Sequence, residues 1–166
     1  MVIGENNKMM NSWFNIYNFE FVSPSSYDFN NVILNSSHIF DIIKREMIYF
    51  GNYTNIYVGG FSQGACMSYY IGYSFPFKIG GLIICSGLFF PQIKINDCNK
   101  DLKVFVGYGT ADEIIEPDLM QLSMSFINNL KEVKVHFYYG MNHTIGKKEC
   151  EDIYEFINGK GRSCCL

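Results

Sequence analysis

The chain has 166 residues, of which 48% are hydrophobic and 17% are charged, a composition that suits one soluble globular domain with a sizeable core. The net charge is −3 without any basic run, so nucleic acid is not an expected partner. Residues 1–10 lack the features of a signal peptide, and no apolar run reaches transmembrane length. We therefore expect a single cytoplasmic domain over residues 1–166, with no integral membrane segment. Peripheral contact of this domain with a membrane is compatible with the sequence.

The cysteines give no sign of a disulfide framework or of a metal centre. They form no C-x-x-C pair, and two of them fall inside predicted core elements, so we expect reduced thiols. Metal ligands in a credible spacing are absent from the sequence, and we predict neither a metal nor another cofactor. The six residues are Cys66, Cys85, Cys98, Cys150, Cys164 and Cys165.

The first fifty residues predict loops followed by one long helix. Residues 1–11 are polar and without period, and residues 12–16 form a short aromatic segment, so both are predicted as loop. A turn signal at residues 24–26 precedes apolar residues that recur at helical spacing. These patterns predict a helix over about residues 26–50, which Gly51 and Asn52 end.

The next segment has the pattern of a strand, a tight turn and a helix. Residues 53–58 are rich in β-branched and aromatic side chains, and a helix-compatible segment follows Ser62. Gly60 and Gly64 flank this serine in a G-x-S-x-G pattern, and side chains at both glycines are expected to collide with the neighbouring strand and helix. The pattern is typical of a nucleophile elbow, in which a strained serine stands above a sheet.

The remainder of the chain alternates strands and helices. Short apolar runs at residues 79–85, 102–106 and 133–139 are typical of strands buried on both faces, and helical patterns cover about residues 117–130 and 147–157. With the strand before Ser62 this makes four predicted strands. The expected class is α/β, with a parallel sheet that helices cover on both faces.

Three catalytic residue types follow three of these strands. Parallel sheets gather ligands at the carboxyl ends of their strands, where Ser62, Asp112 and His143 are expected. Their chain order, serine, aspartate, histidine, is that of the α/β-hydrolase fold. His143 would accept the proton of Ser62, and Asp112 would fix the imidazole tautomer and stabilise imidazolium.

Other residues compete for some of these roles. Glu113 and Glu116 remain alternatives to Asp112 as the orienting acid, although both look like the start of the following helix. His38 falls in a helix and His136 inside a strand, so neither is expected at a carboxyl end. Gln63 is expected to donate its backbone N–H to an oxyanion hole.

Four collinear segments between about residues 7 and 157 resemble the acyl-protein thioesterase and lysophospholipase group of α/β-hydrolases, also called the phospholipase/carboxylesterase family. The G-G-F-S-Q-G form is much more specific than G-x-S-x-G alone. The resemblance implies hydrolysis of acyl thioesters or esters, with Ser62, Asp112 and His143 matching the family triad. The segments are SWFNI at 12–16, GGFSQGA at 59–65, GTADEII at 109–115 and GMNH at 140–143.

The chain departs from the family pattern at its start. Nothing in it resembles the family's earlier strands or its H-G-x-G-D-type loop, which supplies the second oxyanion donor, so it looks like the last two-thirds of a family domain. An exposed edge on the Ser62 strand and weak activity are therefore expected. Two alternatives stay open: a catalytically impaired remnant that binds acyl groups or a protein partner, and a plain α/β binding module.

The substrate is the least defined part of the prediction. Acylated protein, lysophospholipid and small ester all fit the implied chemistry. Apolar residues after the second predicted strand suit an acyl chain, so Leu88, Phe89 and Phe90 are expected to line a groove beside Ser62, with Trp13 near its mouth.

Overall fold

The computed structural model describes residues 2–3, 9–18 and 23–159. Its main sheet has four strands, all parallel, in the order β3-β4-β5-β6. The register places Phe61 opposite Cys85 and Cys85 opposite Gly107, so the carboxyl ends of the first three strands lie at one edge of the sheet. This arrangement confirms the predicted α/β class. The strands are β3 (Tyr57–Phe61), β4 (Gly81–Cys85), β5 (Val104–Gly109) and β6 (Val133–Tyr138).

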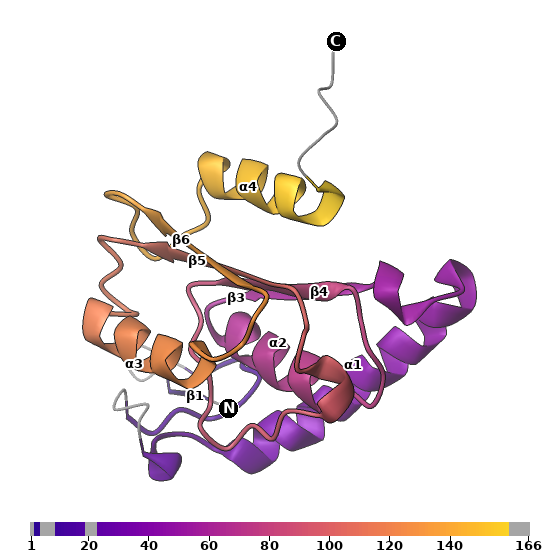
Figure 1. The fold of residues 1–166 in the computed structure, drawn as a ribbon. Coiled ribbons are helices and arrows are strands. Elements are labelled where there is room, and N and C mark those ends of the chain that lie inside the picture. Colours follow the sequence, from indigo (N-terminus) through magenta and orange to yellow (C-terminus); the bar gives the residue numbers. More distant parts are fainter. Residues whose placement is uncertain (1, 4–8, 19–22, 160–166) are drawn as a thin grey trace.

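Helices cover both faces of this sheet, as predicted. Figure 1 shows one group of helices below the sheet and the C-terminal helix, in yellow, above it. The lower group contains α1 (Phe29–Phe50), α2 (Gln63–Ser74) and α3 (Pro117–Ile127), and the upper helix is α4 (Lys147–Asn158). Because both faces are covered, every residue of β5 is buried.

The bounds of α1 follow from its caps. The Asp28 side chain accepts a hydrogen bond from the backbone N–H of Asn31 at 3.1 Å, which starts the helix at Phe29. Gly51 ends it in the left-handed conformation, φ 68°, with its N–H donating to the Met47 carbonyl. The helix begins three residues later than predicted because Pro24–Ser26 form a separate 3₁₀ turn.

Two other boundaries differ from the sequence prediction. Tyr53–Asn55 form a 3₁₀ turn rather than the start of a strand, because the Asn52 side chain accepts from the Thr54 N–H at 2.9 Å. The polar segment predicted as loop contains two short antiparallel strands, β1 (Val2–Ile3) and β2 (Met9–Met10). They form a separate two-stranded sheet, so the prediction of loop there is wrong for these residues.

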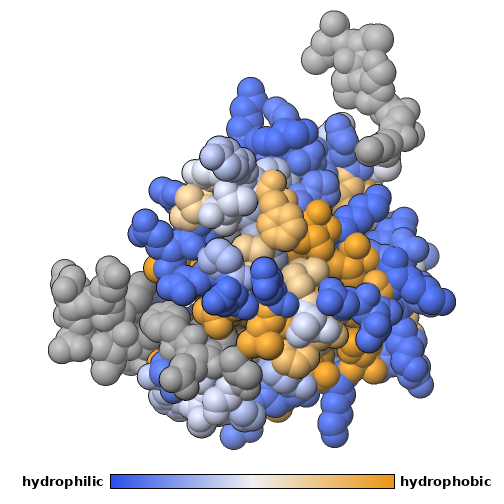
Figure 2. Space-filling model, turned by 60° about the vertical axis from the view of Figure 1, so that its left-hand side comes forward, coloured by the Kyte–Doolittle hydropathy of each residue, from blue (hydrophilic) through white to orange (hydrophobic). Residues whose placement is uncertain are grey.

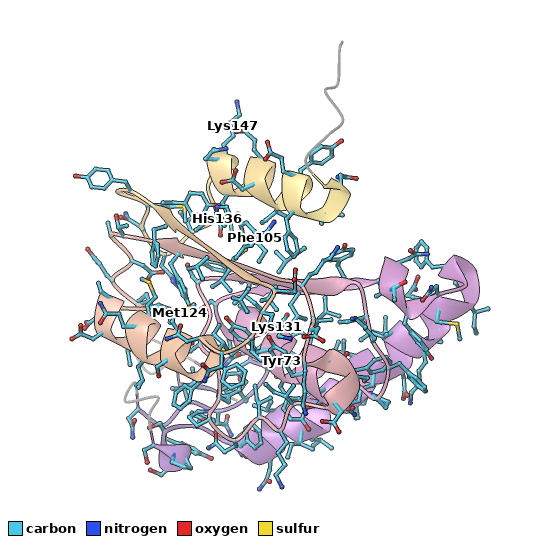
Figure 3. All side chains as sticks on the ribbon, in the orientation of Figure 1. Tyr73, Phe105, Met124, Lys131, His136 and Lys147 are labelled. Carbon is cyan, nitrogen blue, oxygen red and sulfur yellow. The ribbon has the colours of Figure 1, made fainter. Side chains whose placement is uncertain are left out.

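The core is dominated by aromatic side chains beneath the sheet. Phe90 is fully buried and packs against Phe14, Tyr27 and Phe29, with ring centroids 4.5 to 5.8 Å apart. Figure 3 shows Tyr73 in this lower layer, whereas Phe105 lies between the sheet and α4. Edge-to-face contacts of this kind hold the loops before α1 against the layer that carries the elbow.

The elbow itself depends on a close approach of β3 and α2. A Cβ at Gly60 would lie 2.3 Å from the backbone carbonyl of Gly64, a contact that neither element can relieve. A Cβ at Gly64 would meet only the Trp13 indole nitrogen at 3.8 Å. The expectation that both glycines are required by collisions is therefore right for Gly60 and wrong for Gly64.

We expect Gly60→Ala to lower the free energy of unfolding by about 1 to 3 kcal/mol, the range for overpacked sites. Gly64→Ala should leave stability nearly unchanged, because its new methyl group has room. Urea unfolding of both variants followed by circular dichroism measures the difference. Equal stability of the two variants would contradict the proposed role of the Gly60 contact.

Candidate active site

Ser62 occupies the turn between β3 and α2 in a strained backbone conformation. Its φ is 54° and its ψ −121°, in a region that residues with a side chain rarely adopt. Its N–H donates to the Cys85 carbonyl at 2.9 Å, which ties the turn to the end of the neighbouring strand. Its side chain does not cap α2, so the hydroxyl is available for other contacts.

The loop that carries His143 is fastened to the loop that follows β5. Gly140 has φ 69° and donates its N–H to the Thr110 hydroxyl at 2.9 Å, and Ala111 donates to the Met141 carbonyl at 3.0 Å. Gly109 permits this contact, since a Cβ there would lie 2.0 Å from the Met141 carbonyl oxygen. The two loops therefore form one unit at the carboxyl end of the sheet.

The structure brings the three predicted catalytic residues together. His143 Nε2 lies 2.8 Å from Ser62 Oγ, and His143 Nδ1 lies 2.8 Å from Asp112 Oδ2. The Phe61 ring packs against the imidazole, with centroids 4.7 Å apart, and limits its rotation. Hydroxyl, imidazole and carboxylate thus form a continuous hydrogen-bonded chain across loops from three strands.

Asp112 is held in its charged form by directed hydrogen bonds. Its side chain is fully buried, and its Oδ1 accepts from the backbone N–H groups of Ile114 and Ile115 at 2.9 and 2.8 Å. Burial acts to raise the pKa of this carboxyl, but the Ile115, His143 and Ile114 contacts outweigh it and hold the pKa below the ordinary value. An anion is therefore fixed against His143 Nδ1.

The competing acids and histidines lie elsewhere. Glu113 is exposed, and Glu116 immediately precedes α3, so neither replaces Asp112 beside His143. His38 is exposed on α1. Figure 3 shows His136 next to Phe105, beneath α4, and its ring stacks on that phenyl ring at 4.9 Å.

Gln63 has a contact that the sequence did not reveal. Its Nε2 donates to the Phe14 carbonyl and its Oε1 accepts from the Trp13 N–H, both at 2.7 Å. This clamp fixes the segment before α1 against the elbow. Because Gln63 is the first residue of α2, no helical carbonyl can accept its own N–H, which can instead meet a developing negative charge beside Ser62.

A cavity of about 450 Å³ opens beside Ser62 along β3. Trp13 lines it, together with apolar side chains of α1 and α2. Leu88, Phe89 and Phe90 do not line it; they are only 2%, 7% and 0% exposed and belong to the core. The expectation for these three residues is wrong because their side chains turn under the sheet. The apolar lining consists of Trp13, Ile39, Val58, Phe61, Met67 and Ile71.

The wider surface and the cysteines bear on binding. Figure 2 shows hydrophobic side chains reaching the surface in groups between hydrophilic ones. No helix among the described residues is long and apolar enough to cross a membrane, and the same residues contain no cluster of metal-ligating side chains. The cysteines that the structure describes, Cys66, Cys85, Cys98 and Cys150, are free thiols.

Comparison with known proteins agrees with this fold. The parallel sheet, with serine, aspartate and histidine in that order after β3, β5 and β6, defines an α/β-hydrolase. The model of the phospholipase/carboxylesterase family matches residues 1–160, so the chain belongs to this family. It is 32% identical over 162 residues to acyl-protein thioesterase 1 of Debaryomyces hansenii, a match that covers 90% of this chain and 67% of that relative. Acyl-protein thioesterase 1 of Yarrowia lipolytica is also 32% identical, over 157 residues, with 89% and 68% covered.

Solved structures support the same fold. Arabidopsis thaliana SOBER1 superposes with a TM-score of 0.79 at 24% identity, over 95% of this chain and 77% of its own. Acyl-protein thioesterase 2 of Zea mays gives a TM-score of 0.70 at 16% identity, with 89% and 71% covered. The chain thus spans about two thirds to three quarters of the length of these proteins.

The lowered pKa of Asp112 predicts a specific loss of stability in acid. A carboxyl whose pKa falls on folding contributes stability above its unfolded value, here 3.8, and loses that contribution as the pH falls through the folded value. In Asp112→Asn the free energy of unfolding should therefore decrease less steeply than in the wild type as the pH falls below about 4. Urea titrations across this range measure the slope, and an unchanged slope in the variant would contradict the inference.

Proposed function

We propose that this member of an ester and thioester hydrolase family cleaves acyl esters or thioesters through Ser62, His143 and Asp112. The observation that carries the proposal is the pair of 2.8 Å contacts that His143 makes, one with Ser62 Oγ and one with Asp112 Oδ2. The strained elbow supports it, because backbone strain of this kind is retained where a side chain must be presented.

In the first step, Ser62 Oγ attacks the acyl carbonyl carbon. His143 Nε2 accepts the hydroxyl proton as the new C–O bond forms, and Asp112 stabilises the imidazolium. The tetrahedral intermediate then collapses. The bond to the alcohol or thiol breaks, His143 returns the proton to that leaving group, and the acyl group remains on Ser62.

In the second step, a water molecule takes the place of the leaving group. His143 removes a proton from this water molecule while the water oxygen attacks the acyl carbon. The proton then passes to Ser62 Oγ as the carboxylic acid departs. The Gln63 N–H faces the oxyanion in both steps. One donor of this kind contributes roughly 2.7 to 4 kcal/mol to transition-state stabilisation.

The cavity beside Ser62 supports a substrate with an apolar acyl group. Its side chains from α1 and α2, including Ile39, Met67 and Ile71, are apolar, and each buried CH₂ contributes about 0.8 kcal/mol. The leaving group stays outside this apolar lining. Acylated protein, lysophospholipid and small carboxylic ester therefore share the acyl part that the cavity fits, and relatives named acyl-protein thioesterase favour the first.

We expect Ser62→Ala to lower the kcat for a chromogenic butyryl ester by at least about 10⁴-fold and to abolish labelling by a fluorophosphonate probe. The reason is that no other hydroxyl in the triad can form the acyl intermediate. Ester hydrolysis and gel-based labelling measure the two effects on the same protein samples.

Ser125→Ala is the matched control, since Ser125 is exposed on α3 and its hydroxyl only donates to the Leu122 carbonyl. This variant should keep full labelling. Labelling that survives in Ser62→Ala would assign the nucleophile to another residue. A wild-type chain that is neither labelled nor active would refute the proposal and favour an acyl-binding or protein-interaction module.

A further inference from the structure

Glu149 is a buried acid on the opposite side of the sheet from α2, the helix that follows Ser62. It is the third residue of α4 and is 0% exposed, although Figure 3 shows its near neighbour Lys147 pointing away from the sheet. Neither of its carboxyl oxygens forms a well-aligned hydrogen bond with a described residue, although the Cys85 thiol and the Gly146 N–H lie close to the carboxyl. A buried carboxyl with such weak partners is costly when charged, so its presence here calls for a physical role.

The carboxyl lies directly against the strands that carry the site. A Cβ at Gly107 of β5 would lie 2.1 Å from Glu149 Oε1, so the glycine makes room for the acid. In the sheet register Gly107 is opposite Cys85, which is opposite Phe61, the residue before Ser62. Glu149 thus contacts the sheet at the level of the elbow.

Glu149 is also linked to His143 through the start of α4. The helix is capped by Gly146, which has no side chain and makes no side-chain capping bond. A glutamate at the third helical position is the residue that reaches back to the N-cap N–H in a capping box. Gly146 lies three residues after His143, and a Cβ there would lie 2.9 Å from Met141 Sδ, so the start of α4 packs against a side chain of the same loop.

We propose that Glu149 is a positioning residue whose buried carboxyl, packed on Gly107 and next to Gly146, fixes the loop of residues 140–146 and so holds His143 in register with Ser62. Glu149 touches no reacting atom. Its effect on catalysis rests on the function proposed above, whereas its effect on the loop does not.

The groups around the carboxyl favour its neutral form. Burial raises the pKa of Glu149, the Cys85 thiol and the Gly146 backbone oppose this rise in part, and Asp152 adds to it. Cys85 and Tyr138 carry raised pKa values themselves, so both stay uncharged at neutral pH. Cys150, His136 and Lys148 also lie on this side, and His136 and Lys148 are 3.8 and 2.7 Å from Asp152.

The sign of the pH effect follows from the raised pKa. An acid that holds its proton more tightly when folded contributes stability below its unfolded pKa and loses it as the pH rises through the folded value. The loop of residues 140–146 should therefore loosen on the alkaline side as Glu149 ionises. An amide of the same shape cannot ionise and should keep the loop fixed.

Hydrogen exchange by mass spectrometry tests the loop directly, between about pH 6 and about pH 9, with protection corrected for intrinsic exchange. Glu149→Gln should match the wild type at the lower pH and keep protection of residues 140–149 at the higher pH, where the wild type loses about 10-fold or more. Glu149→Met, which keeps the volume but no polar head, should lose protection at both. Glu151→Gln, an exposed neighbour with the same charge change, should follow the wild type.

Ester hydrolysis by the same proteins gives the catalytic readout. Glu149→Met should lower kcat by roughly 10- to 100-fold with little change in KM, the scale for a slightly misplaced catalytic group, and Glu149→Gln should restore it and remove the alkaline loss. The proposal would be overturned if the protection of residues 140–149 in the wild type did not change with pH. It would also be overturned if these residues were as protected in Glu149→Met as in the wild type. If the exchange results differ from those expected, the positioning role of Glu149 is wrong. If they are as expected but the wild type is inactive, only the proposed function is wrong.

Discussion

The close backbone contact between β3 and α2 at Gly60 is the constraint on which the site depends. Nothing larger than hydrogen fits between Gly60 and the Gly64 carbonyl, so a glycine at position 60 permits the sharp reversal in which Ser62 has φ 54°. The cost of such a conformation is of order 1 to 3 kcal/mol, which the surrounding structure must offset. The hydrogen bond from Ser62 N–H to the Cys85 carbonyl and the Gln63 clamp on Trp13 and Phe14 supply part of that support.

Parallel strand pairing converts this local constraint into a site. The register fixes where each strand ends, so the residues that follow β3, β5 and β6 meet at one edge although they are distant in sequence. Hydrogen bonds between the loops after β5 and β6, one of them to the Thr110 hydroxyl, then set the distance between Asp112 and His143. Electrostatics completes the arrangement, because the buried Asp112 anion orients the imidazole that faces Ser62.

Sequence patterns predicted the parts of the molecule that depend on chain order. The G-x-S-x-G turn and the buried apolar runs gave the strands and their carboxyl ends, and so placed Ser62, Asp112 and His143 in one cluster. The side chains of Leu88, Phe89 and Phe90 were misplaced because a run of apolar residues does not say whether it faces a cavity or the core.

Contacts made across the fold were beyond the reach of the sequence. The Gln63 side chain forms hydrogen bonds with residues 49 and 50 positions earlier, and no local pattern signals that pairing. Glu149 stands where an acid near a helix start is usually exposed, yet the space left by Gly107 buries it. A glutamate three residues after a glycine at a predicted helix start was the available signal for its capping position.

The central claim is that an acyl group passes through Ser62. The most direct measurement is to quench the chain with acid during turnover of a butyryl ester and to locate any added acyl group by tandem mass spectrometry. The account predicts one butyryl group, attached to Ser62, that disappears as turnover ends. A butyryl group found on another side chain would contradict it. So would the absence of any butyryl group on the protein if the alcohol product is released in a burst.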